Sequence, residues 1–522
     1  MSKIKKIDID TGRNHIIYLH KDGLILKKEG FKSLNRVKIF NDILTIYGTL
    51  HIIENDFFLN KDEIGLSKIF FKKYNITEGE IFTIKSIEII PSFHSILLKL
   101  DGINYEENDL NLIFDDIIKE KYDDSQIACF CASTSGNNLN EKELMYLTKA
   151  MINKNTKIDW KNIINNQNQN NQNQKNNKNQ KNNQNNQKNS IIVDKHCIGG
   201  IPGNRTTLPS IAIVAEYGML IPKTSTRSIT SPSGTIDTME VFTNVYASNE
   251  KIKEIVNKTN GCIIWSGNLS PLDEIVMSVQ KDLSLDGKGL MIASIISKKM
   301  AAGSTHILID IPYGPQSKCK NKELANSLKF DFETLGKNLG LEIYVHLSEG
   351  NQPIGNGIGP ALEANDILKI LKNENDAPVD LKEKIIFLAG IIIEFDENVK
   401  KGDGKKIAKE ILESGRAYER FKKICEAQGG FKNEISMAKF NRDFVANFEG
   451  KVCGIDIKKI DSLARLTGCP DDKEAGIYIY KHLNDYVKKG EKIMTIYSNS
   501  IGELNTAFDF AEKEEIFKIM KD

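Results

Sequence analysis

The stretch from Ile191 to Gly218 places three different patterns in immediate succession. The β-branched apolar run Ile191–Val193 predicts a strand, and Leu208–Gly218 has apolar residues at helical spacing. Between them lies the glycine-rich turn DKHCIGGIPGNRTT. A strand, a tight turn and a helix in this order are the repeating unit of α/β domains. This stretch therefore predicts an α/β architecture for the central part of the chain.

The turn between this strand and this helix has the features of an anion site. Gly199, Gly200 and Gly203 let the backbone turn tightly and leave N–H groups free to point at a ligand. The helix N-terminus expected at Thr206–Thr207 adds a partial positive charge, and Lys195 adds a full one. Phosphate is the anion that we expect here.

A second loop, Ser225–Glu240, reads STRSITSPSGTIDTME and follows another short apolar stretch. Hydroxyl side chains surround its one cation, Arg227, and such donors suit phosphate and ribose oxygens. A polar surface loop with a helix N-cap at Ser233 or Thr235 is the alternative. A single glycine-rich loop is a weak signal, but two within one βα-rich segment favour a nucleotide or phosphosugar site.

The two loops together resemble the thymidine phosphorylase family. That family carries a KHS-TGG loop and an S-x-R…GGT-x-D-x-x-E loop in the same order, and the resemblance covers nearly the whole chain apart from one insertion. The sequences CIGGIPGNRTT and RSITSPSGT resemble the corresponding loops of the archaeal AMP phosphorylase branch. The resemblance implies phosphorolysis of an N-glycosidic bond: AMP and phosphate give adenine and ribose 1,5-bisphosphate, with CMP and UMP as further candidate substrates.

The resemblance also implies the site residues. Asp286 matches the proton donor of the AMP branch, which would protonate the leaving base. Ser294 and Lys298 are four apart on one helical face, and Lys298 matches a base-binding lysine of the pyrimidine enzymes. Cys197 stands where those enzymes place a phosphate-binding serine, although a thiol is a weaker donor. The implied phosphate-binding residues are Lys195, Gly199, Thr206 and Ser225. The implied AMP-binding residues are Gly200, Thr226, Arg227, Ser228, Ile229, Thr230, Ser231, Thr235, Ser294 and Lys318.

The pattern along the chain predicts an α/β multidomain fold. Residues 1–85 read as a small β-rich domain, with strands at Ile4–Ile9, His15–His20, Leu24–Lys27, Val37–Phe40, Ile43–Tyr47 and Ile81–Ile84. Residues 86–164 read as the first part of a helical domain, in which Asn140 caps the helix that begins at Glu141. Residues 190–439 form the central α/β phosphate-binding domain with further helical-domain segments, and residues 440–522 a C-terminal α+β domain to which we assign no chemistry.

Residues 165–189 contain only Asn, Gln and Lys, with no apolar side chain to bury. We expect a disordered, mildly basic insertion tolerated at the surface, with RNA binding by its lysines as the alternative. The β-rich domain at residues 1–85 contains no catalytic constellation. Our hypothesis is that it serves assembly, and a truncation starting at Lys85 that kept the native oligomer size would rule this out.

The charge balance of 71 lysines and arginines against 70 aspartates and glutamates gives no global field to attract nucleic acid or a membrane. No apolar run approaches ~20 residues, so we expect a cytoplasmic protein. The eight scattered cysteines contain no CxxC pair, and we expect free thiols and no metal site. The reaction needs no cofactor beyond the co-substrate phosphate, and the resemblance implies a homodimer or larger homo-oligomer.

Three alternatives to an AMP phosphorylase remain open at this point. A pyrimidine-nucleoside phosphorylase would cleave thymidine and leave AMP intact. A phosphoribosyltransferase should require magnesium, so activity that survives EDTA would exclude it. A non-catalytic nucleotide-binding or RNA-tethering protein should lose nothing on Asp286→Asn, whereas a phosphorylase should lose turnover more than affinity.

Overall fold

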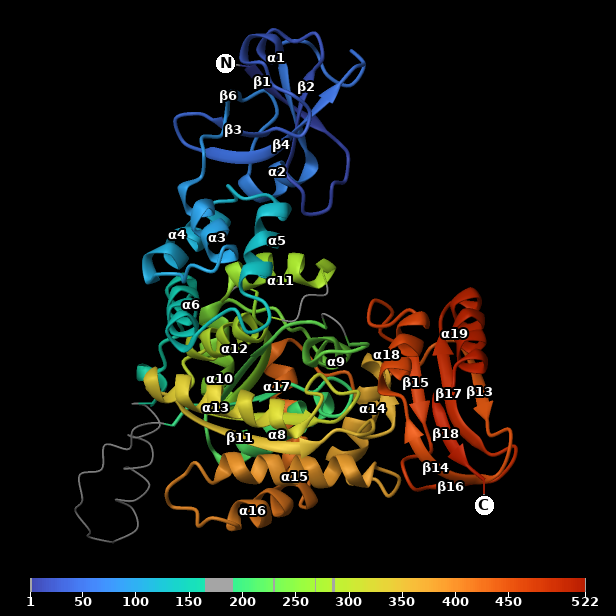
Figure 1. The fold of residues 1–522 in the computed structure, drawn as a ribbon. Helices are drawn as coiled ribbons and strands as arrows, with labels where there is room; N and C mark the ends of the chain where they lie inside the picture. Colours follow the sequence, from blue (N-terminus) through green and yellow to red (C-terminus); the bar gives the residue numbers. More distant parts are fainter. Residues whose placement is uncertain (1, 165–190, 229–230, 268, 284–286, 522) are drawn as a thin grey trace, which may run out of the picture. The chain divides into compact units, whose positions relative to one another are not determined.

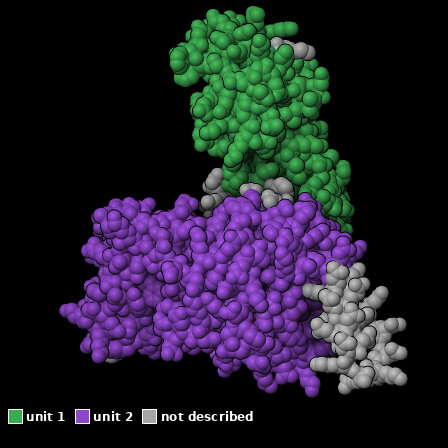
Figure 2. All heavy atoms as spheres, turned by 180° about the vertical axis from the view of Figure 1, so that it is seen from behind, with its two compact units in different colours: residues 1–154, 271–294 green, residues 155–270, 295–522 purple. Residues whose placement is uncertain are grey.

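The computed structural model describes residues 2–164, 191–228, 231–267, 269–283 and 287–521. The predicted insertion at residues 165–189 lies outside these ranges. The chain divides into two compact units (Figure 2). Unit 1 comprises Met1–Lys154 and Pro271–Ser294, and unit 2 comprises Asn155–Ser270 and Ile295–Asp522. The chain therefore enters unit 2, returns to unit 1 for one helical segment, and ends in unit 2.

Unit 1 begins with a closed six-stranded barrel in the order β1-β5-β2-β4-β3-β6. The pairs β1–β5 and β2–β4 are parallel, and the other neighbours are antiparallel. Ile17, Val37, Ile39 and Leu50 fill its interior without exposure to solvent. The strands are β1 (Ser2–Ile7), β2 (Ile16–His20), β3 (Arg36–Phe40), β4 (Thr45–Ile53), β5 (Glu63–Ser67) and β6 (Ile81–Ser86), with a short helix α2 (Lys68–Tyr74) after β5.

The strand predicted at Leu24–Lys27 is wrong, because this segment forms helix α1 (Leu24–Glu29). Gly23 stands at the N-cap, and Gly30, with φ 67°, ends the helix in the left-handed conformation that glycine adopts readily. The N–H of Gly30 donates to the carbonyl of Leu26 at 3.1 Å. Four residues are too few to separate a strand pattern from one turn of a helix, so the two flanking glycines decided the outcome.

Helices complete unit 1 and pack around Phe114, Phe130 and Leu147. The predicted cap at Asn140 is confirmed, because its Oδ1 accepts from the N–H of Glu143 at 2.9 Å and the Glu143 carboxylate accepts from the N–H of Asn140 at 3.0 Å. The helices are α3 (Pro91–Leu100), α4 (Glu107–Ile118), α5 (Asp124–Ser133), α6 (Glu141–Lys154), α11 (Pro271–Leu283) and the first half of α12 (Lys288–Ala301).

Unit 2 is built on parallel strands whose order explains where a ligand can bind. Strands β11, β10 and β7 form one parallel sheet, and β8 pairs in parallel with β9. The N–H of Val193 donates to the carbonyl of Leu220 at 2.9 Å and joins β7 to β8. The spatial order is therefore β11-β10-β7-β8-β9. The strands are β7 (Val193–Cys197), β8 (Ile221–Ser225), β9 (Gly261–Trp265), β10 (His306–Tyr313) and β11 (Glu342–Glu349).

The direction of strand addition reverses beside β7. The chain adds β8 and β9 on one side of β7 and then returns to add β10 and β11 on the other. In open α/β sheets ligands bind beyond the carboxyl ends of the strands at such a reversal. The surrounding helices are α8 (Thr207–Tyr217), α9 (Thr235–Phe242), α10 (Asn249–Thr259), α13 (Lys322–Asn338), α14 (Pro360–Leu371), α15 (Val379–Ile393), α16 (Asp403–Glu413) and α17 (Arg416–Gln428).

The C-terminal domain, at the red end of the chain in Figure 1, is also part of unit 2. Its two sheets have the orders β12-β15-β17-β13 and β16-β14-β18. Strand β12 precedes α14 in the chain but pairs with β15, so a backbone ladder joins the domain to the α/β core. The elements are β12 (Gly357–Ile358), β13 (Phe440–Val445), β14 (Gly450–Ile455), α18 (Ile457–Leu466), β15 (Gly476–Ile479), β16 (Tyr486–Val487), β17 (Lys492–Ser498), α19 (Ile501–Lys513) and β18 (Phe517–Met520).

These elements confirm the predicted fold class, an α/β multidomain protein with a β-rich N-terminal part, a helical part, an α/β core and a C-terminal α+β part. Across the described residues, none of the helices combines the length and the apolar character needed to span a bilayer.

Candidate active site

The first loop begins at Lys195 on β7 and ends in α8. The Lys195 side chain is fully buried, and its Nζ donates to the hydroxyls of Thr206 at 2.7 Å and Thr207 at 3.1 Å. Burial lowers the pKa of Lys195. The structure thus brings the predicted residues Lys195 and Thr206 together at the N-terminus of a helix, where an anion is favoured.

Glycines in this loop allow it to lie directly on the neighbouring strand. A Cβ at Gly199 would lie 2.4 Å from Cγ of Pro312 on β10, and one at Gly203 would lie 2.4 Å from Sγ of Cys197. Gly200 has φ +58°, in the left-handed region. The loop is therefore fixed at the carboxyl ends of β7 and β10, where the strand order reverses.

A buried polar cluster that the sequence did not reveal lies beside Cys197. The Cys197 thiol donates to Oδ2 of Asp310 at 3.6 Å, and Lys384 on α15 approaches the same oxygen at 3.0 Å. The Ser348 hydroxyl donates to the other Asp310 oxygen at 3.0 Å. Burial, followed by the negative charge of Asp310, raises the pKa of Cys197 to about 12, so the thiol stays protonated. The one available signal was an aspartate within the apolar strand THILIDIP.

Asp194 forms a second buried cluster next to Lys195. Its carboxylate approaches Nζ of Lys299 on α12 at 2.8 Å and Nζ of Lys223 on β8 at 3.3 Å. His196 lies close to these lysines, and burial followed by their positive charge lowers its pKa well below the ordinary value. His196 is therefore neutral near pH 7. Asp194 anchors α12, the helix that carries the predicted residues Ser294 and Lys298, to the strand below the first loop.

The second loop is held by one buried carboxylate. Oδ2 of Asp237 accepts from the N–H groups of Ser228 at 2.7 Å and Gly234 at 3.0 Å. The helix N-cap predicted at Ser233 or Thr235 is wrong, because Gly234 occupies that position and Thr235 is the first helical residue. Asp237 in the first turn supplies the capping oxygen, so a hydroxyl at the N-cap is not needed.

Arg227 in the second loop contacts partners on both sides. Its guanidinium donates to the Glu240 carboxylate and to the Tyr246 hydroxyl. It also lies over the rings of Tyr246 and Trp265, 5.4 and 5.9 Å from their centroids. The side chain retains 37% exposure. Arg227 is therefore an oriented and still accessible cation on this loop.

A buried network connects the two loops. Arg205, in the last part of the first loop, donates to the carbonyls of Ile201 at 3.0 Å and Ile354 at 2.7 Å and to Oε1 of Glu363 at 3.3 Å. Oε2 of Glu363 accepts from Thr238, in the helix that follows the second loop, at 3.2 Å. Burial, opposed by the charge of Arg205, raises the pKa of Glu363 to about 7. The distance between the loops is thus fixed by side chains that the sequence did not single out.

The predicted site residues divide into four sets. Lys318 follows β10 at the same edge of the sheet, whereas Ser294 is the last residue of its segment in unit 1. Asp286, Ile229 and Thr230 lie outside the described residues. The described residues that gather around the two loops of unit 2 are Lys195, Gly199, Gly200, Thr206, Ser225, Thr226, Arg227, Ser228, Ser231 and Thr235.

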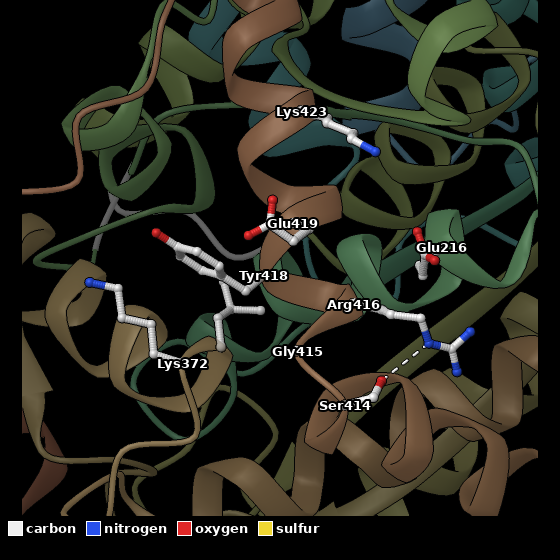
Figure 3. Close-up of a pocket in the computed structure, with 9 residues that line it drawn as sticks. Glu216, Lys372, Ser414, Gly415, Arg416, Tyr418, Glu419 and Lys423 are labelled. Carbon is white, nitrogen blue, oxygen red and sulfur yellow. Dashed lines mark hydrogen bonds between the residues drawn. The ribbon is translucent and has the colours of Figure 1, made fainter.

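The structure also contains a surface hollow of about 510 Å³ (Figure 3). It is lined by the ends of α8 and α14 and the start of α17, and includes none of the predicted site residues. Among the described residues no three His, Cys, Asp or Glu side chains are grouped to hold a metal ion. All eight cysteines are free thiols, as predicted.

Comparison with known proteins identifies the family. Residues 189–418 match the family model "Glycosyl transferase family, a/b domain", and residues 454–515 match "Pyrimidine nucleoside phosphorylase C-terminal domain". The chain is 39% identical to a "Putative thymidine phosphorylase" from Legionella pneumophila (strain Corby), over 98% of this chain and 94% of that protein. It is 38% identical to a protein of the same name from Rhodopseudomonas palustris, over 99% of this chain and 95% of the other.

A solved structure of anthranilate phosphoribosyltransferase from Thermus thermophilus matches 65% of this chain and 99% of its own, with 15% identity and a TM-score of 0.49. The relatives above cover almost the full length of both chains, and they match the region of both loops as well as the C-terminal domain. The chain therefore belongs to the thymidine/pyrimidine nucleoside phosphorylase family.

Proposed function

We propose that the protein is a nucleoside-5′-monophosphate phosphorylase that converts AMP and phosphate into adenine and ribose 1,5-bisphosphate. Family membership supports a nucleoside phosphorylase, and the choice of a nucleotide substrate is our own step. The observation that carries it is the position of Arg227. A 5′-phosphate requires a cation in addition to those that hold inorganic phosphate, and we assign the accessible Arg227 guanidinium of the second loop to it. The S-x-R motif of the family places an arginine here in nucleoside enzymes as well, so the substrate panel below decides between the two substrates.

In this mechanism inorganic phosphate attacks the anomeric carbon of the ribose as the base leaves. The N–H groups of the first loop and the start of α8 bind the attacking phosphate, with Lys195 and Thr206 beneath it. The hydroxyls of the second loop bind the ribose and its 5′-phosphate. No covalent enzyme intermediate is needed, which agrees with the protonated state of Cys197.

The leaving adenine requires a proton at a ring nitrogen, and we assign its delivery to Asp286. A carboxyl group keeps its proton near neutral pH only when it is desolvated or close to another negative charge. The bound nucleotide and phosphate supply that charge during the reaction. Bound AMP and phosphate would therefore help Asp286 to keep the proton that it donates.

A thymidine phosphorylase is the second candidate, favoured by the names of the relatives. The deciding experiment is a substrate panel of AMP, CMP, UMP, adenosine and thymidine, scored for free base with and without phosphate. We expect phosphate-dependent release of adenine from AMP and none from adenosine. Release of thymine from thymidine without any base from the monophosphates would refute the proposal and establish the second candidate.

A further inference from the structure

The C-terminal domain extends one lysine into the second loop. Lys473 lies between α18 and β15, and its Nζ approaches Oδ1 of Asp237 at 3.0 Å and Oε2 of Glu240 at 3.0 Å. Its own carbonyl accepts from the N–H of Ala361 at 2.9 Å, at the start of α14. Lys473 is thus fixed by its backbone as well as by its side chain, 236 residues along the chain from Asp237.

Asp237 is a buried carboxylate that forms an ion pair with this lysine. Its side chain is almost completely buried, at 1% exposure for the residue. One carboxylate oxygen accepts from the N–H groups of Ser228 and Gly234, both in the second loop, and the other accepts from Lys473. Within the described residues Lys473 is the cation at ion-pair distance from Asp237. A buried carboxylate that loses its cation either takes up a proton or moves towards water, and both outcomes weaken its bonds to the loop.

Lys473 reaches the same loop by a second route. Oε2 of Glu240 accepts from Lys473 at 3.0 Å and from Nε of Arg227 at 3.5 Å, and Oε1 accepts from the same guanidinium. Burial opposes the ionisation of Glu240, but hydrogen bonds from Arg227 and Lys473 outweigh it, so the pKa of Glu240 lies below its ordinary value. The charged Glu240 orients Arg227, the cation assigned above to the 5′-phosphate. Both routes from Lys473 therefore end on residues of the substrate loop.

We propose that Lys473 is a positioning residue of the active site, through which the C-terminal domain holds Ser228 and Gly234, by way of Asp237, and Arg227, by way of Glu240, in position for the substrate. This rests on the proposed function in that the loop binds the sugar phosphate. Lys473 acts through Asp237 and Glu240 and is not assigned a contact with the reacting atoms.

The test compares Lys473→Met with Lys473→Arg in the full-length protein. The matched control is Lys492→Met, which breaks an ion pair with Asp443 at 2.8 Å elsewhere in the same domain. The first measurement is hydrogen–deuterium exchange of the Ser228 and Gly234 amides without any ligand. We expect faster exchange in Lys473→Met, near wild-type exchange in Lys473→Arg, and no change in the control.

The second measurement is the kinetics with the substrate that the panel identifies. Loss of the cation from a buried charged hydrogen bond should raise KM for the nucleotide about 10- to 100-fold, with a much smaller change in kcat. Lys473→Arg should restore most of this loss. A wild-type protein that cleaves thymidine and leaves AMP intact would overturn the proposed substrate alone, because the exchange measurement does not depend on the substrate.

A second pair of variants covers the case in which Lys473→Met fails to fold. Asp237→Asn keeps an oxygen for the two loop amides and removes the charge that needs Lys473. In the Asp237→Asn background, Lys473→Met should therefore raise KM and the amide exchange rates much less than it does in the wild-type background. Unchanged exchange together with an unchanged KM in Lys473→Met, or equal losses in both backgrounds, would overturn the inference.

Discussion

Replacing Arg205 by methionine should weaken the buried network that connects the two loops. The resulting loss in the free energy of unfolding should depend on pH. Methionine keeps much of the apolar volume of the arginine stem but removes the charge and every donor. The carbonyls of Ile201 and Ile354 would lose their bonds of 3.0 and 2.7 Å, and Glu363 would lose the cation at 3.3 Å. At pH 6 we expect a loss of about 1–3 kcal/mol from the unpaired acceptors.

The loss should grow above pH 7. In the wild type, the pKa of Glu363 is raised to about 7, so its folded state resists ionisation and stability falls as pH rises from 4.5 through 7. Without Arg205 the folded pKa lies higher still, so the variant continues to lose about 1.4 kcal/mol per pH unit after the wild type has levelled off. By pH 8 the difference should reach about 3–5 kcal/mol, the usual cost of leaving a buried charge without its partner.

Tryptophan fluorescence during urea unfolding gives a direct assay. The chain has two tryptophans, Trp160 and Trp265, and both belong to unit 2, so the signal reports on the unit that contains Arg205. Arg416→Met is the control, because Arg416 pairs with Glu410 at the surface and should contribute less than about 1 kcal/mol at any pH. A variant at Arg205 that is no less stable than this control at pH 8, or whose loss is independent of pH, would refute the reasoning.

Three further predictions concern catalysis, the first loop and unit 1. Asp286→Asn should lower kcat about 10²- to 10⁴-fold with little change in KM, as measured by steady-state kinetics. An equally large rise in KM would contradict the role of Asp286 as the acid. Gly199→Ala should weaken phosphate binding, because the added Cβ would lie 2.4 Å from Pro312. Gly454→Ala is the control and should leave binding unchanged, because the nearest atom to its Cβ would lie at 3.4 Å. Isothermal titration with phosphate compares the two variants. Burial, followed by nearby cations, lowers the pKa of His15 to about 4, so unit 1 should lose stability as pH falls from 6.5 through 4. Circular-dichroism melts at pH 7 and pH 4.5 should show a smaller loss in His15→Gln, and an equal loss would count against this.

The C-terminal domain combines a predictable fold with a contact that local sequence does not indicate. Its strands were predictable from alternation and turn residues, as at β15 and β17. No chemistry was assigned to it, because Lys473 stands in the sequence as one lysine among many charged residues. Its position beside Asp237 depends on the ladder between β12 and β15, which brings this part of the chain to the second loop.

What the sequence determined by itself was local. The order of strand, glycine-rich turn and helix, the two candidate loops and the cap at Asn140 all follow from residues a few positions apart, whose conformational preferences act within one turn of the chain. The one helix predicted as a strand, Leu24–Glu29, was short enough for both patterns to fit.

Only the tertiary structure decided which side chains share a partner. Arg205 meets Glu363 from 158 residues away, and Asp310 lies beside Cys197 because β10 was added next to β7 and not next to β9. The strand order sets these neighbours, and burial then gives them altered pKa values, since desolvation depends on what packs around a group and not on its place in the chain. A sequence can therefore name candidate phosphate-binding loops, but the packing of distant elements fixes their shape and charge.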